Sequence, residues 1–233
     1  MFPLKDDIPA RRLPIVTTLI IALNCVVFLI ELMAGRRVEN IFLMYGLIPA
    51  RYTIPDISNL FNLQEQVLPF IFSMFIHGGW THLIGNMWTL WVFGDNVEDK
   101  LGSFRFLIFY IIGGVAAAIM HILTNADSPI PTIGASGAVA SVMGAYFRFF
   151  PGAKIMTMIP PFIFGPFFKI PAILFLGWWF VLQFFNGTLA LAENTKIAAG
   201  VAWWAHIGGF LFGIFLSTIV LPKRRRDADW EWV

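Results

Sequence analysis

Residues 14–33 read PIVTTLIIALNCVVFLIELM, an apolar run that contains one charged side chain, Glu31. A transmembrane α-helix needs about 20 predominantly apolar residues, so this run is long enough to cross a bilayer. Five further stretches have a similar length and are largely apolar, at residues 80–97, 104–123, 132–150, 170–189 and 200–221. The sequence therefore predicts an all-α fold, a polytopic membrane protein with six transmembrane helices in a compact bundle.

The composition supports this class of protein. Hydrophobic residues make up 58% of the 233 positions and charged residues 13%, whereas a soluble domain carries about 25% charged residues. We therefore expect one membrane-embedded domain over residues 1–233, with a long outer loop at 34–79 and a short basic cytoplasmic tail at 222–233. The net charge of +2 comes largely from that tail, and it indicates membrane topology rather than a nucleic-acid partner.

Two apolar segments need separate interpretation. The run after Arg12 is about 19 residues long, more than the ~7–15 residues of a signal-peptide core, so we expect a retained first helix. Residues 67–76 are also apolar, but Pro69 and the Gly-Gly pair at 78–79 are expected to interrupt a helix there. We expect this segment to dip into the membrane interface as part of the outer loop, and residues 186–199 to cap a pocket on the same side.

The lysine and arginine residues predict the orientation in the membrane. With a cytoplasmic N-terminus, four of the sixteen fall on the outer side, namely Arg36, Arg37, Arg51 and Lys196. The excess on the inner side favours cytoplasmic N- and C-termini. We expect a multi-pass protein of the plasma (inner) membrane of a prokaryote. In this orientation the outer ends of the second, fourth and sixth spans carry His82, Ser136 and His206.

Ser136 and His206 are reactive polar side chains in otherwise apolar spans. Polar groups that are costly in lipid usually serve a function or have a partner. With a helix rise of about 1.5 Å per residue, both residues are expected on the order of 6–9 Å below the outer boundary. A serine and a histidine at one depth are the minimum pair for nucleophilic catalysis, in which the imidazole takes the hydroxyl proton.

Small residues at helical spacing predict close contact between the fourth and sixth spans. One face of each span carries such residues, namely Gly137, Ser141 and Gly144 in the fourth and Ala202, Gly209 and Gly213, beside His206, in the sixth. Small residues at this spacing let transmembrane backbones pack tightly. A side chain as short as serine is then within reach of the neighbouring helix.

His82 and Asn86 extend the candidate site, because i, i+4 spacing puts both on one face of the second span. Acyl transfer needs hydrogen-bond donors aimed at the developing oxyanion, and these two side chains with the backbone N–H of Ser136 are suitable donors. A structural interpretation exists as well. Taken alone, Ser136 fits a small-residue packing face, and His206 fits a histidine bonded to a neighbouring carbonyl. The matched depth and the second histidine favour catalysis.

Four segments of the chain resemble the motifs of a known family. They are HLIGN at 82–86, GDNVEDKLG at 94–102, GASG at 134–137 and AHIGG at 205–209. In this order they match the H-x-x-x-N, G-x-x-x-E-x-x-x-G, G-x-S-G and A-H-x-x-G motifs of the rhomboid intramembrane serine proteases. One such motif is weak, but four in order on the expected spans make a specific match.

The resemblance implies a rhomboid-like bundle that acts as an intramembrane serine protease. It implies a catalytic dyad of Ser136 and His206 without an acid, and an oxyanion site formed by His82, Asn86 and Ser136. Single-span membrane proteins in the lipid bilayer would be cleaved near their outer ends through an acyl-enzyme. No cofactor and no metal is implied, and the oligomeric state is not indicated. We expect Glu98, within the second motif, to bond backbone groups of the loop between spans two and three.

One departure from the family pattern lies near the dyad. Family members often carry an aromatic residue four positions after the serine, where this chain has Ala140. We therefore expect Trp203, Trp204 or neighbouring phenylalanines to position the imidazole. Two other functions stay open: a catalytically inactive rhomboid-like protein that binds membrane clients, and a proton-coupled transporter. The transporter is less favoured, because no internal repeat is evident.

Overall fold

A computed structural model gives the fold of the chain and describes residues 1–158, 167–192 and 201–220. The predicted basic tail, Lys196 and half of the expected cap at 186–199 lie outside the described residues.

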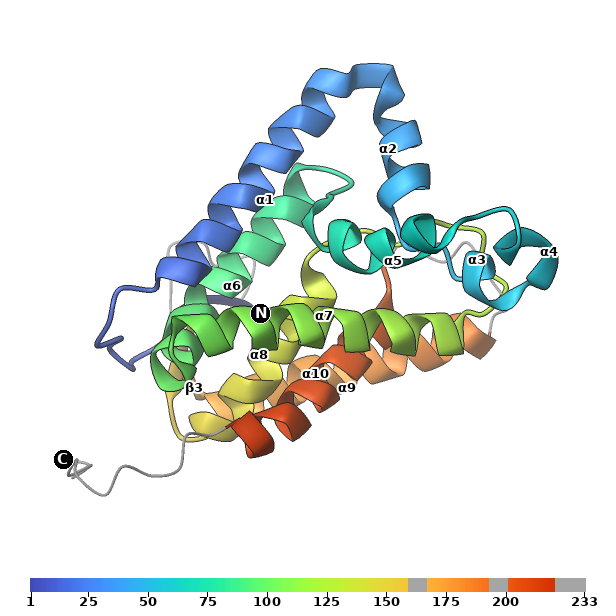
Figure 1. The fold of residues 1–233 in the computed structure, drawn as a ribbon. Helices are drawn as coiled ribbons and strands as arrows, with labels where there is room; N and C mark the ends of the chain where they lie inside the picture. The colour runs from blue at the N-terminus through green and yellow to red at the C-terminus, as the bar shows by residue number, and fades with distance from the viewer. Residues whose placement is uncertain (159–166, 193–200, 221–233) are drawn as a thin grey trace.

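Helices occupy all six predicted spans, so the all-α, polytopic membrane fold is confirmed (Figure 1). They are α1 (Ile15–Ala34), α6 (Trp80–Leu101), α7 (Ser103–Thr124), α8 (Ser136–Phe149), α9 (Ala172–Ala192) and α10 (Trp203–Val220). Within the described residues, four helices are long and apolar enough to cross a membrane, or up to five when the bent pair of α6 and the helix before it counts as one span. The count of six spans is therefore not confirmed.

α8 is the helix that departs most from the predicted span. It has 14 residues and begins at Ser136 rather than at residue 132, because Thr132 forms an antiparallel bridge with Leu47 and the chain turns at Gly134. A 14-residue helix is about 21 Å long, less than the roughly 30 Å of a hydrocarbon core. All residues from 138 to 146 are buried. A helix enclosed by protein in this way does not have to match the thickness of the lipid.

The outer loop at 34–79 contains more helix than expected. Its elements are η1 (Gly35–Arg37), α2 (Val38–Tyr45), α3 (Ala50–Thr53), α4 (Pro55–Ser58), α5 (Leu63–Phe72) and η2 (Ser73–Phe75). The prediction that Pro69 interrupts a helix is wrong, since Pro69 lies inside α5. Proline leaves the carbonyl four residues earlier without its helical partner. That carbonyl, on Glu65, instead accepts a hydrogen bond from Arg51 Nη1 at 3.5 Å.

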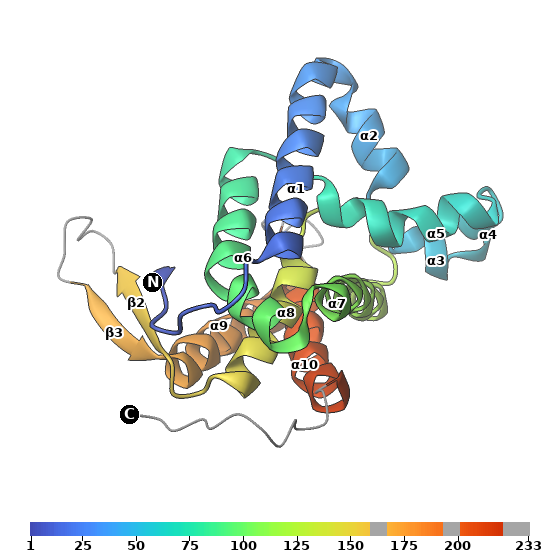
Figure 2. The ribbon, with the colours of Figure 1, turned by 60° about the vertical axis from the view of Figure 1, so that its left-hand side comes forward.

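A small antiparallel sheet lies beside the helices and was not expected from the sequence. Its strands are β1 (Phe2–Lys5), β2 (Lys154–Met158) and β3 (Phe168–Pro171), in the order β1-β2-β3. Figure 2 shows this sheet beside the start of α9, on the opposite side of the bundle from α3 and α4. The sheet lies away from the helix ends that carry the candidate site residues.

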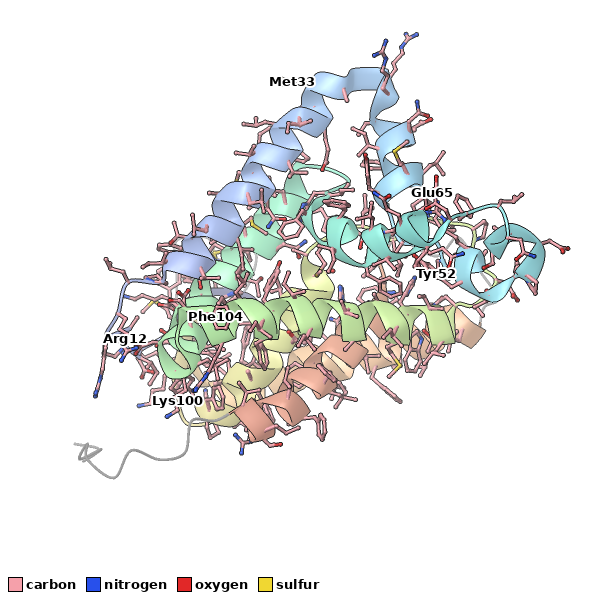
Figure 3. The ribbon with its side chains drawn as sticks, viewed as in Figure 1. Arg12, Met33, Tyr52, Glu65, Lys100 and Phe104 are labelled. Atoms are coloured by element: carbon pink, nitrogen blue, oxygen red, sulfur yellow. The ribbon has the colours of Figure 1, made fainter. Side chains whose placement is uncertain are left out.

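The two membrane faces can be recognised from the ends of the helices. In Figure 3, Arg12 and Lys100 lie near one end of the bundle, and Met33 lies at the far end of α1. α8 and α10 begin on the same side as the end of α1, since α1 and α6 are joined through the outer loop and each later helix runs back across the bundle. Ser136 and His206 therefore lie toward the face opposite Arg12 and Lys100.

α8 lies at the centre of the bundle and packs against α6, α7 and α10. Its contact with α10 depends on glycine: a Cβ atom on Gly144 would meet the Phe210 carbonyl, and one on Gly209 would meet the Gly137 carbonyl. A Cβ atom on Gly213 would likewise collide with the backbone of Ser141. The predicted close packing of these two helices is confirmed, and it brings the start of α8 next to the start of α10.

Candidate active site

Ser136 is the first residue of α8. The first N–H groups of an α-helix have no intrahelical partner, so the backbone N–H of Ser136 belongs to a set of donors that can bind an anion. The chain reaches this position through Gly134, which has φ of 120° and donates its N–H to the Ser73 carbonyl at 2.8 Å. A Cβ atom on Gly134 would lie 2.5 Å from the His82 ring. Position 134 thus requires glycine for two reasons: the positive φ of the turn and the close approach of the His82 ring.

His206 lies in the first turns of α10 and faces the serine. Its Nε2 atom is 2.8 Å from Ser136 Oγ, across 70 positions of sequence. Both side chains are half-buried. This distance lies within the range for a nucleophile and its general base. The serine hydroxyl is thus directed at the histidine, while the α8–α10 contact itself is made by Gly137, Gly144 and their partners.

His206 makes a second hydrogen bond that the sequence analysis missed. Its Nδ1 atom is 2.8 Å from Oε1 of Gln183, a 7% exposed side chain on α9. Trp179 and Trp203 flank the imidazole, with ring centroids at 6.0 Å and 6.3 Å. The expected role of Trp203 in holding the ring is therefore supported, whereas the indole of Trp204 donates to the Gly187 carbonyl. An amide buried in a predicted transmembrane helix was a signal that could have identified Gln183.

His82 and Asn86 lie on one face in the first turns of α6. His82 approaches Gly134 as described above, and the Asn86 Nδ2 atom would be 3.6 Å from a Cβ atom at that glycine. Asn86 is 7% exposed. The two side chains therefore lie beside Gly134, two positions before Ser136 in the chain.

Asn86 is held from behind by residues that the sequence analysis did not assign to the site. Its Nδ2 atom lies 3.1 Å from Nε2 of His77, and the His77 ring packs edge-on against His82 with centroids 5.1 Å apart. The backbone N–H of His77 in turn donates to both carboxylate oxygens of Glu31 at 3.2 Å. Glu31, on α1, is 3% exposed. This chain of contacts fixes the orientation of the Asn86 amide.

All four predicted site residues line one cavity of about 880 Å³. Further lining residues come from the end of α7 and the segment after it, and they include the polar residues His121, Thr124, Asn125, Asp127 and Ser128. A cavity of this size is within the range of ligand-binding pockets. Polar groups at membrane depth are tolerated where they line such a cavity or are buried in protein.

Glu98 has a structural role, but with different partners from those expected. Its carboxylate accepts hydrogen bonds from the backbone N–H groups of Val16 and Thr17 at 2.9 Å and 2.7 Å, and from the Thr17 hydroxyl at 2.8 Å. The Ser103 hydroxyl is a further donor at 2.6 Å. Glu98 therefore caps the start of α1 and ties it to the start of α7, where a negative charge is also favoured by the helix dipole.

The chain is similar to several curated proteins. Presenilin-associated rhomboid-like protein A, mitochondrial, of Danio rerio is 29% identical over 65% of this chain and 37% of its own length. RHOMBOID-like protein 5 of Arabidopsis thaliana is 27% identical over 73% of this chain and 52% of its own length. Rhomboid protein 1, mitochondrial, of Saccharomyces cerevisiae is 29% identical over 69% of this chain and 45% of its own length. The chain thus spans about half or less of each of these relatives.

These relatives correct the predicted localisation. Several of them are named as mitochondrial proteins, and they come from a fish, a yeast, a plant and mammals. Because these relatives are named as mitochondrial proteins of eukaryotes, the prediction of a prokaryotic plasma membrane with cytoplasmic termini is wrong. The distribution of lysine and arginine distinguishes the two membrane faces, but it does not identify the compartment that each face borders.

A comparison with protein families covers the larger part of the chain. The family described as the Rhomboid domain matches residues 64–223. The match includes α6 to α10, and with them Ser136, His206, His82 and Asn86. The chain belongs to the rhomboid family.

Proposed function

We propose that this chain is an intramembrane serine endopeptidase that cleaves transmembrane segments near the membrane face where α8 and α10 begin. The observation that carries the proposal is the 2.8 Å contact between His206 Nε2 and Ser136 Oγ at the wall of a large cavity. A protein that only bound membrane clients would not need a serine and an imidazole at this distance. The aligned pair favours catalysis over that alternative.

In the proposed mechanism, His206 Nε2 takes the hydroxyl proton as Ser136 Oγ attacks the carbonyl carbon of the substrate peptide bond. The carbonyl oxygen gains the negative charge, and we assign its stabilisation to the Ser136 N–H, His82 and Asn86. The C–N bond then breaks and the leaving amine takes the proton from His206. Water hydrolyses the resulting ester, with His206 again acting as the base, and the serine is regenerated.

The substrate must expose a peptide bond that is shielded while the segment is helical. Local unwinding costs least where the segment contains glycine or other weak helix formers, because each glycine lowers helix stability by about 1 kcal/mol relative to alanine. We therefore propose single-span membrane proteins with such residues near the cleaved end as the substrate class.

The test uses the full chain, purified in detergent, with a panel of single-span substrates and a fluorophosphonate probe. The probe forms a covalent adduct with an activated serine, and the adduct resembles the tetrahedral intermediate. Cleavage and labelling are expected in the parent chain and are expected to be lost in Ser136→Ala.

Ser141→Ala is the matched control. Ser141 lies on the same helix, is fully buried and donates only to the Ala138 carbonyl of its own helix at 2.7 Å. This variant is expected to keep both cleavage and labelling. Normal cleavage by Ser136→Ala would overturn the assignment, and a folded parent chain without labelling at Ser136 would favour the inactive, client-binding alternative.

A further inference from the structure

The dyad of His206 and Ser136 has a third polar contact, which comes from a different helix. Gln183 Oε1 on α9 lies 2.8 Å from His206 Nδ1, while His206 Nε2 lies 2.8 Å from Ser136 Oγ. The three side chains therefore form one line of hydrogen bonds across α9, α10 and α8. Gln183 is 7% exposed, so this contact is largely protected from competing solvent.

The chemistry of the amide determines which tautomer of His206 fits. The Gln183 Nε2 atom is directed at the Trp179 carbonyl at 3.4 Å, which leaves the side-chain oxygen facing the histidine. An amide oxygen only accepts hydrogen bonds, so Nδ1 of a neutral His206 must carry the proton. Nε2 is then free to accept the hydrogen bond from the Ser136 hydroxyl, as a general base requires.

We propose that Gln183 is the positioning residue of the dyad, holding His206 in the Nδ1–H tautomer with Nε2 directed at Ser136. This inference rests on the proposed proteolytic function and adds a third side chain to it. Gln183 does not line the cavity, so it acts through His206 and makes no contact with the substrate.

The other neighbours of the imidazole do not supply this function. The rings of Trp179 and Trp203 contact the imidazole at centroid distances of 6.0 Å and 6.3 Å, and such contacts restrict the ring without selecting a tautomer. Ala140 does not supply it either, since its side chain is a methyl group without a hydrogen-bonding atom. This methyl group lies at the α10 backbone, where a Cβ atom on Gly209 would be 3.3 Å from it. The described residues thus provide one hydrogen-bond partner for Nδ1, and that partner is Gln183.

A neutral acceptor also affects the charged intermediate. When His206 takes the serine proton, Nδ1–H becomes part of an imidazolium, and its hydrogen bond to the amide oxygen becomes charge-assisted and stronger. No proton passes to Gln183. A carboxylate at this position would stabilise the imidazolium further, whereas an aliphatic side chain would leave Nδ1–H without an acceptor in a buried site.

The inference is tested by measuring the rate of fluorophosphonate labelling at Ser136 and the cleavage kinetics of Gln183→Leu and Gln183→Glu. Gln183→Leu keeps the approximate volume and removes the acceptor, so we expect kcat and the labelling rate to fall roughly 10²-fold, the lower end of what a positioned base contributes. KM is expected to stay unchanged. Gln183→Glu retains an acceptor and is expected to restore most of the labelling rate.

The pH profile separates positioning from a general structural effect. In Gln183→Glu the carboxylate favours the imidazolium, so the acid limb of the rate profile is expected to move to higher pH. Among the described residues, the three other titratable side chains that line the cavity, His82, His121 and Asp127, are the same in every variant. Thr218→Val is the matched control, because Thr218 lies at the far end of α10, the helix that carries His206, and donates to the Phe215 carbonyl of that helix at 2.7 Å. It is expected to keep the rate and profile of the parent chain.

The outcomes distinguish this inference from the proposed function. If Ser136 is labelled in the parent chain but Gln183→Leu has the parent rate and pH profile, the positioning role is overturned and the proteolytic function stands. If Ser136 is not labelled in the folded parent chain, the proposed function fails first. Should Gln183→Leu not fold, the Glu variant decides: an acid limb at higher pH supports the inference, and an unchanged limb overturns it.

Discussion

The orientation of Asn86 shows how single side chains prepare the candidate site. Its amide is held by His77, whose backbone is held by Glu31 on another helix. An amide group fixed in this way loses little entropy when an oxyanion forms beside it, which is the basis of preorganised stabilisation. In the proposed mechanism, part of the function of this site therefore comes from residues that do not contact the substrate.

Loss of one oxyanion donor should be visible in turnover. For Asn86→Ala, and separately for His82→Ala, we expect kcat to fall roughly 10²–10³-fold, as for other single oxyanion donors. Labelling at Ser136 should fall only in part, because the remaining donors and His206 are still present. Steady-state cleavage assays with the full chain measure the effect. Full activity in both variants would leave these residues with a purely structural role.

Glu98 is the residue whose loss should reduce stability most directly. Glu98→Gln removes the charge and turns an N–H donor toward the backbone N–H groups of Val16 and Thr17. Each hydrogen bond to a charged group is worth about 1.5–3 kcal/mol, so we expect at least that loss in the free energy of unfolding. Exposed Glu39→Gln, on α2, is the control and should stay within about 0.5 kcal/mol. Equal unfolding midpoints for the two variants would contradict the capping role.

At the scale of the helices, the contact between α8 and α10 determines the distance between the serine and the histidine. Gly144→Ala would place a methyl group against the Phe210 carbonyl, which is backbone and cannot rotate away. Overpacking of this kind costs about 1–3 kcal/mol. We expect lower thermal stability and slower labelling of Ser136, since the two helix starts would be forced apart.

The control for this prediction is Gly177→Ala on α9. A Cβ atom there meets only the Phe147 ring at 4.0 Å, and alanine favours a helix by up to about 1 kcal/mol over glycine. This variant should be as stable as the parent chain or more stable. If both alanine variants label at the parent rate, close packing of α8 and α10 is not what positions the dyad.

The helices also show what the sequence could and could not predict. Apolar length located the six helices of the predicted spans, but not α2 to α5 in the outer loop. The spacing of Gly137, Gly144 and Gly209 predicted the α8–α10 contact, because it is a local pattern. The helix through Pro69 could not be predicted. Pro69 leaves the Glu65 carbonyl without its helical donor, and that carbonyl accepts a hydrogen bond from Arg51, which lies in α3. Gln183 was missed because its partner lies 23 positions away on another helix.

For the whole molecule, the N-terminal segment is the part that the motifs do not explain. It precedes the residues matched by the family, yet it is bound to three other elements. The Pro3 carbonyl accepts from the Trp88 indole on α6 at 2.6 Å, and Asp7 accepts from the backbone of Lys154 on β2 at 2.7 Å. Asp6 accepts hydrogen bonds from Tyr146 on α8 and from Asn96 on α6. The segment thus joins the sheet to the centre of the bundle.

Asp6 makes the stability of this connection depend on pH. Burial raises its pKa above the ordinary 3.8, with a smaller contribution from Asp7, although the hydrogen bond from Tyr146 opposes the rise. A carboxyl group with a raised pKa in the folded state binds more protons there than in the unfolded state, so its contribution to stability increases as the pH falls toward 3.8 and decreases as the pH rises.

Asp6→Asn cannot titrate and keeps an acceptor for Tyr146. We therefore expect the difference in Tm between the parent chain and Asp6→Asn to shift in favour of the parent chain from neutral toward acid pH, measured by tryptophan fluorescence in detergent. The nearest other carboxylates, Asp7 and Asp95, are present in both proteins and largely cancel in the difference. A difference in Tm that is constant with pH, or that shifts in the opposite direction, would show that Asp6 is solvated in the folded protein and that the N-terminal segment is not held against α8.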